Sequence, residues 1–255
     1  MKTKRLINLK SKEEIDVLRG AGRVLASIVK DLKGSLKSRM TTKDIDSEVE
    51  ELIAHYEAKP AFKGYRGFPA SACVSINQEV VHGIPGERVI KDGDIVSIDI
   101  GIIYKNYFSD TAFTVSFGKI DAGLQRLIDV TRESLYRGIE QAVVRNRLFD
   151  ISYAIQSYVE SHRFSVVRDF VGHGIGRMLH EEPEVPNFGV PHSGPMLREG
   201  MVLAIEPMVN MGTWETKVLD YGWTVVTKDN KPSAHFEHTI AVTANGPEIL
   251  TEYTE

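Results

Sequence analysis

Cysteine is nearly absent from the 255-residue sequence: Cys73 is the single one, so no disulfide can form within the chain. This excludes a disulfide-stabilised scaffold and favours a reducing compartment. Long apolar runs are also missing. None approaches the roughly 20 residues of a membrane-spanning helix, and the first residues lack the apolar stretch of a secretory signal. The sequence therefore predicts a cytoplasmic protein without a membrane segment.

An excess of basic charge is missing as well. The chain has 31 Lys and Arg against 35 Asp and Glu, a formal net charge of -4, whereas a DNA-binding protein normally presents a basic face. We therefore expect no DNA partner. Basic residues do gather at the start, in residues 1–10, which we expect to be a solvated N-terminal tail. They are Lys2, Lys4, Arg5 and Lys10, followed directly by Lys12.

The sequence also lacks any segment typical of a linker between domains. No stretch is rich in Pro, Gly and Ser, and the composition is that of an ordinary globular protein, with 42% hydrophobic and 26% charged residues. Residues 11–255 are therefore expected to form a single domain.

Apolar residues spaced three and four apart predict four helices. Ser11 and Glu14 form a capping box at the start of the first, and Pro60 is expected to end the second. The predicted helices cover residues 11–33, about 41–58, 123–144 and 150–161.

Segments rich in β-branched residues follow each pair of helices and predict strands. They cover residues 72–76, 95–104 and 110–117 in the first half, and 164–171, 201–209, 223–227 and 238–242 in the second. We therefore predict an α+β fold.

The two halves, about 11–118 and 121–245, also share motifs. Residues 92–99 align with 199–206, and both segments end in a carboxylate. The pair His82-Gly83 has a counterpart in His173-Gly174. These matches, in the same order, predict an internal duplication. The alternative is two similar halves whose acids coincide by chance.

Four carboxylates lie in or beside apolar strand segments. Asp99 is centred in one and Glu206 lies within another, while Asp110 and Glu237 lie at the start of predicted strands. Burial of a lone carboxylate is costly unless it is paired, protonated or bound to a metal. For any one of them a structural salt bridge is the simpler interpretation, but four at related positions favour a shared cation.

His173 supplies a nitrogen ligand, since the glycines on both sides of it let the backbone turn sharply. One histidine and four carboxylates suit two divalent ions bridged by carboxylates and a water, with Mn, Fe, Co and Zn all acceptable. A Cys-rich zinc site, an H-E-x-x-H motif, a P-loop and a G-x-S-x-G elbow are all missing. Nucleophilic catalysis therefore has little support.

These segments resemble type I methionine aminopeptidase over nearly the whole chain. The matching motifs are Ser-Ile-Asn at 75–77, Val-Val-His-Gly-Ile-Pro at 80–85, residues 92–99, Asp-Thr at 110–111, Gly-His-Gly-Ile-Gly at 172–176, His-Glu at 180–181, Ala-Ile-Glu-Pro at 204–207 and Glu-His-Thr at 237–239. The resemblance implies the pita-bread fold, in which pseudo-two-fold halves contribute an antiparallel sheet and covering helices. It also implies removal of the N-terminal methionine from nascent proteins and peptides, with preference for a small second residue.

The resemblance also implies roles for site residues. Asp110 and Glu237 would bridge two divalent ions, Asp99 would bind one of them, and His173 with Glu206 the other. The bridging water or hydroxide would attack the carbonyl, with Glu206 as the general base. His180 would donate to the carbonyl oxygen and His82 would contact the departing amide nitrogen. The methionine pocket would consist of Tyr65, Phe68, Cys73 and Trp223, with His82 at its edge.

Two positions depart from the best-known pocket pattern, namely Phe62 and Leu179, which affects the expected pocket shape. The resemblance further implies a monomer, and transient ribosome contact through the basic start is an alternative to a merely solvated tail. Two other functions stay open. A proline-specific exopeptidase of the same fold usually has a large extra N-terminal domain, whereas only 10 residues precede the first predicted helix. A non-catalytic binding protein usually loses ligands, whereas all five are present.

Overall fold

The helices of the computed structural model, which describes residues 6–253, begin close to where capping residues predict. Ser11 and Glu14 form the expected capping box at the first helix, and Thr41 with Asp44 forms another at the second. The helices are α1 (Lys12–Ser35), α2 (Thr42–His55), α3 (Ala122–Glu140) and α4 (Leu148–Ser161). The described helices include none that is long and apolar enough to cross a membrane.

Two predicted helix ends are wrong. The second helix ends at His55 instead of about residue 58, because Lys59–Pro60 forms a short strand, β1, against residues 102–103. The third ends at Glu140 instead of residue 144, and a turn follows it.

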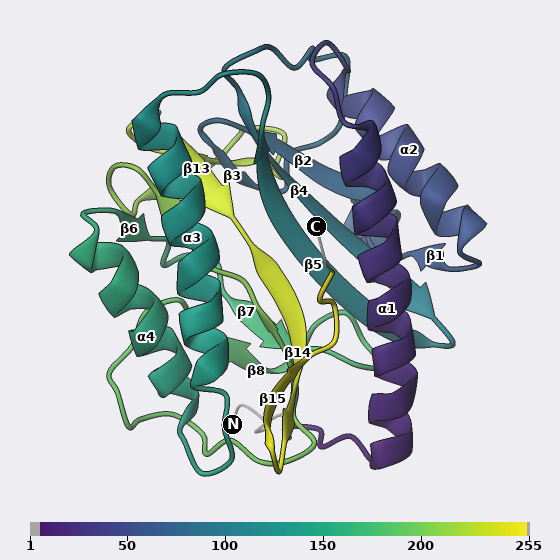
Figure 1. Cartoon of the computed structure of the whole chain (residues 1–255), viewed down its shortest axis with the longest axis vertical. Coiled ribbons are helices and arrows are strands. Elements are labelled where there is room, and N and C mark those ends of the chain that lie inside the picture. The colour runs from purple at the N-terminus through teal and green to yellow at the C-terminus, as the bar shows by residue number, and fades with distance from the viewer. Residues whose placement is uncertain (1–5, 254–255) are drawn as a thin grey trace.

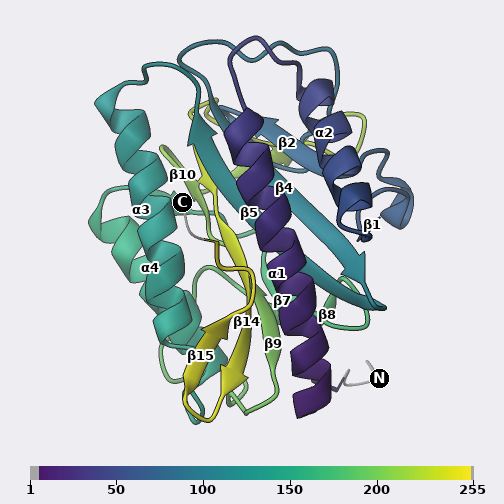
Figure 2. The same cartoon turned by 45° about the vertical axis from the view of Figure 1, so that its right-hand side comes forward.

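The main sheet is antiparallel throughout and has the order β1-β4-β5-β14-β9-β7-β8, with β2 paired to β4 and β15 to β14. Figures 1 and 2 show α1 and α3 in front of this sheet, with β5 and β14 between them. Its strands are β2 (Ala72–Ile76), β4 (Ile95–Tyr104), β5 (Tyr107–Ser116), β7 (Gly172–Gly174), β8 (Glu181–Val185), β9 (Val202–Ile205), β14 (Glu237–Thr243) and β15 (Gly246–Ile249).

Two small sheets extend this framework, β13-β10-β6 and β11-β12-β3. Their strands are β3 (Glu79–Val81), β6 (Ser165–Val166), β10 (Met208–Asn210), β11 (Thr216–Val218), β12 (Val225–Thr227) and β13 (Ser233–His235). The strand predicted over 164–171 is therefore mostly loop. The strand predicted over 201–209 divides into β9 and β10 at Glu206-Pro207, where proline lacks the N–H that a ladder needs.

Apolar side chains of the helices pack against the sheet and form the main core. Leu25, Ile28 and Leu32 of α1 belong to the same buried cluster as Ile98 of β4 and Leu127 of α3. A second cluster lies around Phe62, Phe68, Cys73 and Leu179, the residues on which the expected pocket depends. This second cluster also includes Ile15 and Leu18 of α1, so it connects the first helix with the region that holds the candidate site.

Lys10 is not part of a solvated tail, contrary to the sequence prediction. Its side chain is 5% exposed, and its ammonium lies 2.5 Å from a Glu181 carboxylate oxygen. The backbone N–H of Lys10 also donates to the carbonyl of Gly200. The sequence could not indicate this burial because the partner carboxylate lies 171 positions away. The other predicted tail charges, Lys2, Lys4 and Arg5, lie outside the described residues.

Contact between α1 and the segment after β15 gives a stability prediction. A Cβ on Gly22 would lie 2.1 Å from the carbonyl oxygen of Leu250, whereas one on Gly20 meets only a Tyr104 ring carbon at 3.8 Å. We expect Gly22→Ala to lower the free energy of unfolding by about 1–3 kcal/mol through overpacking. Gly20→Ala, the matched control in the same helix, should raise it by about 0.5–1 kcal/mol. Urea denaturation measures both, and equal effects would contradict the packing described here.

Candidate metal centre

Three of the predicted carboxylates meet on one face of the sheet because of the strand register. Asp99 of β4 lies opposite Ala112 of β5, and Glu237 of β14 lies opposite the same alanine from the other side. Asp110 precedes Ala112 by two residues and therefore shares its face. The small side chain of Ala112 leaves the space between the carboxylates open.

His173 and Glu206 approach the same place from β7 and from the end of β9. His173 pairs with Ala204, and its Nε2 lies 3.7 Å from a Glu206 carboxylate oxygen. Ligand atoms of Asp110, His173 and Glu237 all lie within 4.8 Å of one another. Two chain regions more than sixty residues apart thus supply one compact group of donors.

Two of the carboxylates, Asp110 and Glu237, are buried, Asp99 and Glu206 are half-buried, and three of the four are incompletely hydrogen-bonded. Asp110 is 4% and Glu237 is 2% exposed. One carboxylate oxygen in each of Asp99, Asp110 and Glu237 is buried and has no hydrogen-bond partner among the described residues. A buried carboxylate oxygen without a partner is costly. A divalent cation between these oxygens would supply the missing interaction, so the donor set fits a metal.

The electrostatics of the metal-free chain give the same conclusion. Burial raises the pKa of Asp99 to about 7. Burial and neighbouring carboxylates raise the pKa values of the other three acids, Asp110, Glu206 and Glu237, well above their ordinary range. Like charges this close cannot all ionise without a cation.

His173 is held in the form that binds metals. Burial lowers its pKa to about 4, so the ring is neutral near pH 7. Its Nδ1 lies 2.9 Å from the carbonyl oxygen of Gly174 and donates to it in the tautomer that this contact favours. The lone pair of Nε2 then faces Glu206. Such a second hydrogen bond commonly orients a metal-binding histidine.

A cavity of about 160 Å³ brings together every residue that the sequence assigned to the site. Apolar and aromatic side chains, here called the apolar wall, line it together with the acids and histidines. Its lining comprises Tyr65, Phe68, Cys73, His82, Asp99, Asp110, His173, His180, Glu206, Trp223 and Glu237, with Phe62, Arg66 and Leu179 in addition.

The apolar wall is built by close ring packing. Phe68 meets Trp223 edge to face, with ring centroids 5.1 Å apart. Cys73 pairs with Asp99 across β2 and β4, and burial raises the pKa of its thiol, which stays protonated. Phe62, one of the two unusual positions, packs over Gly101, where any Cβ would lie 2.4 Å from its ring.

Two histidines flank the acids. The rings of His180 and His173 are tilted by 55° with their centroids 4.3 Å apart, and Nδ1 of His180 lies 2.8 Å from the Tyr65 hydroxyl oxygen. Burial lowers the pKa of His180 to about 3, and the neighbouring His173, Arg66 and His82 lower it further. His82 has a left-handed backbone, with φ of 58°, and burial lowers its pKa as well. Both rings are therefore neutral near pH 7.

The buried Lys10–Glu181 ion pair fixes the chain beside His180. The second carboxylate oxygen of Glu181 accepts from the backbone N–H of Met178, 3.1 Å away, and closes the turn that carries His180. Gly176 lacks the Cβ that would collide with the Lys10 side chain, at 2.5 Å. The segment before α1 therefore supports the site through Lys10, and the sequence did not indicate this role.

His235 is a second residue that sequence reasoning did not assign to the site. It is 1% exposed, and its Nε2 lies 3.7 Å from the other Glu206 carboxylate oxygen. Its position two residues before Glu237 on an extended segment was the available signal, because alternate residues share a face. Arg66 lines the cavity too, and no motif in the sequence indicates it.

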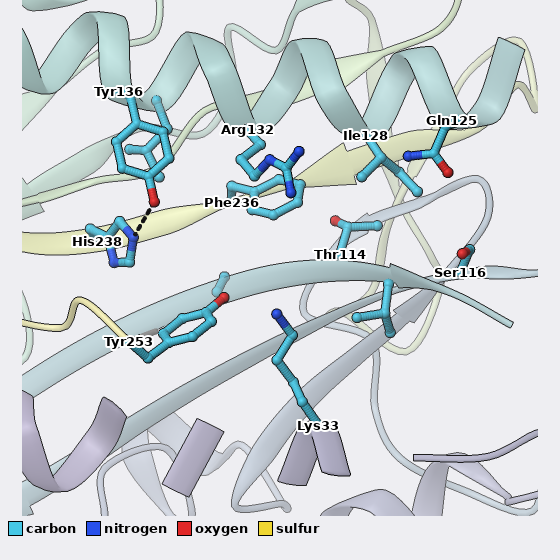
Figure 3. Close-up of a pocket in the computed structure, with 13 residues that line it drawn as sticks. Lys33, Thr114, Ser116, Gln125, Ile128, Arg132, Tyr136, Phe236, His238 and Tyr253 are labelled. Carbon is cyan, nitrogen blue, oxygen red and sulfur yellow. Dashed lines mark hydrogen bonds between the residues drawn. The ribbon is translucent and has the colours of Figure 1, made fainter. Parts of the chain in front are cut away.

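A larger cavity, of about 540 Å³, lies on the opposite face of the sheet between α1 and α3. Figure 3 shows Lys33 and Tyr253 facing Gln125, Arg132 and Tyr136 across it. None of the described residues that line it is a carboxylate. The described lining therefore offers His238 as a nitrogen donor but no carboxylate to accompany it.

Comparisons with known proteins agree with this geometry. The sequence model of metallopeptidase family M24 matches residues 16–244. Methionine aminopeptidase of Clostridium perfringens is 56% identical over 246 residues, which cover 96% of this chain and 99% of that one. The crystal structure of methionine aminopeptidase from Thermotoga maritima has a TM-score of 0.95 at 46% identity and covers 97% of this chain and 100% of its own.

A prolidase from Pyrococcus horikoshii has a TM-score of 0.79 at 22% identity, covering 97% of this chain and 64% of that chain, which is a likeness of fold alone. The predicted pita-bread fold is thereby confirmed.

The raised pKa values predict how the metal-free protein responds to pH. Between pH 3.8, the ordinary value for Asp99, and about 7, the folded chain holds protons that the unfolded chain releases. The contribution to stability is therefore complete below that window and is lost as the pH rises through it. As the pH rises through this window, we expect the Tm of the EDTA-treated protein to fall more steeply than the Tm of EDTA-treated Asp99→Asn. The corresponding difference in the free energy of unfolding is on the order of a few kcal/mol. Parallel Tm curves for the two proteins would contradict the shift.

Proposed function

This chain belongs to metallopeptidase family M24 and, within it, to the methionine aminopeptidases, and on that premise we propose how its residues act. It is a metal-dependent aminopeptidase that removes the N-terminal methionine by hydrolysis. One observation carries the proposal for its site. Buried carboxylate oxygens without partners share a single small cavity with an aromatic and thiol-lined wall.

We propose that the five metal-binding residues hold two divalent ions: Asp99, Asp110, His173, Glu206 and Glu237. The oxygens of Asp99, Asp110 and Glu237 that lack partners support this assignment, as does the orientation of His173 by Gly174. When bound, such ions polarise the substrate carbonyl and lower the pKa of a coordinated water. Which ion is physiological depends on supply, because an oxygen and nitrogen donor set accepts several.

The methionine side chain enters the apolar wall. Tyr65, Phe68 and Trp223 supply ring surface, and the protonated thiol of Cys73 adds a soft, polarizable contact that suits a thioether. Phe62 and Leu179 complete the wall and set the depth of the slot. The small cavity supports a preference for a small second residue. The peptide leaves the cavity beside His82 and His180, and these rings limit the space for the side chain of that residue.

His180 acts as a donor to the scissile carbonyl oxygen. In the tautomer whose Nδ1 accepts a hydrogen bond from the Tyr65 hydroxyl, Nε2 carries the hydrogen that can be donated. A donor aimed at a developing oxyanion typically contributes about 10²–10³ in rate. His82, which lines the same cavity, contacts the departing amide nitrogen. Their lowered pKa values keep both rings neutral across the physiological range.

Glu206 accepts the proton of the attacking water and transfers it to the leaving amine. Its carboxylate stands between His173 and His235, 3.7 Å from each ring. These two neutral rings restrain its orientation without neutralising it. The residue thus combines a general-base role with metal binding.

The wider setting is also proposed. Residues 11–255 act as one catalytic domain in the cytoplasm, as a monomer, on nascent chains and peptides that begin with methionine. The single cysteine, which cannot form a disulfide within the chain, supports a reducing compartment. The basic residues Lys2, Lys4 and Arg5 would serve transient contact with the ribosome. A proline-specific activity has the support of fold likeness alone.

A peptide assay tests the function directly. We expect Mn²⁺-loaded protein to release methionine from Met-Ala-Ser, to lose this activity in EDTA, and to leave Ala-Pro uncleaved.

His180→Ala should lower kcat about 10²–10³-fold because the donor to the carbonyl oxygen is lost. The matched control is His55→Ala, an exposed histidine on α2, which should retain full activity. Faster cleavage of Ala-Pro than of Met-Ala-Ser would overturn the proposed specificity, and an unchanged kcat in His180→Ala would overturn its role.

A further inference from the structure

A groove continues from the metal cavity along the surface of the protein. The two spaces share Tyr65, Arg66, Leu179 and His180, so the groove begins where the reaction site ends. Its volume is about 560 Å³, and exposed apolar side chains such as Leu6 and Met178 form part of its wall. The groove therefore offers a path for the part of a peptide that follows the cleaved bond.

Arg66 stands at the junction of the groove and the cavity in an unusual backbone conformation. Its φ of 50° and ψ of 22° are left-handed, and Gly64 and Gly67 on either side also have positive φ. A non-glycine residue in this region costs on the order of 1–3 kcal/mol and frequently marks a functional position. The Tyr65 ring lies beneath the guanidinium, 5.3 Å away, and further restrains it.

The charges along the groove leave Arg66 uncompensated. Among residues 6–253, no carboxylate lies within ion-pair distance of its guanidinium. Glu181 is neutralised by the buried ammonium of Lys10, and Arg177 shares its charge with Glu14 at 3.5 Å. Glu182 adds one negative charge to the lining. A peptide that leaves the cavity thus meets a free positive charge first.

We propose that Arg66 selects substrates with an acidic side chain at the third position, the second residue after the cleaved bond. This inference rests on the proposed function and adds a specificity determinant to it. The guanidinium binds the carboxylate of that residue, while the small second residue stays beside His180. Arg66 acts in binding and takes no part in the chemical step.

Peptides that differ only at the third position test this inference. Mn²⁺-loaded enzyme is assayed at low salt with Met-Gly-Glu-Gly-Gly and with its Gln and Lys counterparts. We expect kcat/KM to decrease in the order Glu, Gln, Lys, with about twofold to fivefold between Glu and Gln, the effect of one exposed ion pair. The difference should shrink at 0.5 M salt because screening weakens exposed charge pairs.

Variants assign the preference to Arg66. Arg66→Asn removes the charge and suits the left-handed backbone, so it should abolish the Glu preference. Arg66→Lys should retain part of it. Arg23→Gln, on the exposed face of α1, is the matched control and should leave the preference unchanged.

The outcomes separate the two proposals. Methionine release from all three peptides at equal kcat/KM, or a Glu preference that persists in Arg66→Asn, overturns the inference and leaves the proposed function standing. No release from any of the peptides overturns the proposed function, and the inference with it.

Discussion

Repulsion among buried carboxylates is the constraint on which the rest of this structure depends. The register of β4, β5 and β14 brings Asp99, Asp110 and Glu237 to one face, around the small side chain of Ala112. Glu206 joins them from the end of β9. In low dielectric these charges oppose one another, so the folded chain is suited either to protons or to divalent cations. The catalytic proposal follows from the second of these states.

The surrounding fold makes that constraint useful. The hairpin of β4 and β5 and the long strand β14 fix the carboxylates from the centre of the sheet, while helices pack on its opposite face (Figures 1 and 2). The Lys10–Glu181 pair and the Tyr65 hydroxyl then hold His180 beside the acids. The strands therefore position the metal-binding carboxylates, and the turn held by the Lys10–Glu181 ion pair positions His180 as a hydrogen-bond donor.

Local signals in the sequence predicted much of this. The Ser11–Glu14 capping box and the β-branched run of β4 gave correct boundaries because they depend on neighbouring residues. The acids in apolar strand segments indicated the candidate site because this signal, too, depends only on neighbouring residues in the sequence. Burial of Lys10 was not predictable, since its partner Glu181 is distant in the sequence. The break between β9 and β10 and the left-handed turn at Arg66 depend on tertiary context as well.

We hold that the divalent ions bind to the acids whose pKa values are raised by burial and, for Asp110, Glu206 and Glu237, by neighbouring carboxylates as well. Crystals of the protein grown with Mn²⁺, with diffraction recorded at the manganese absorption edge, test it most directly. We expect anomalous density between the carboxylates of Asp110 and Glu237, with Nε2 of His173 within coordination distance of it. Manganese bound only elsewhere on the protein, in crystals of active enzyme, would contradict it.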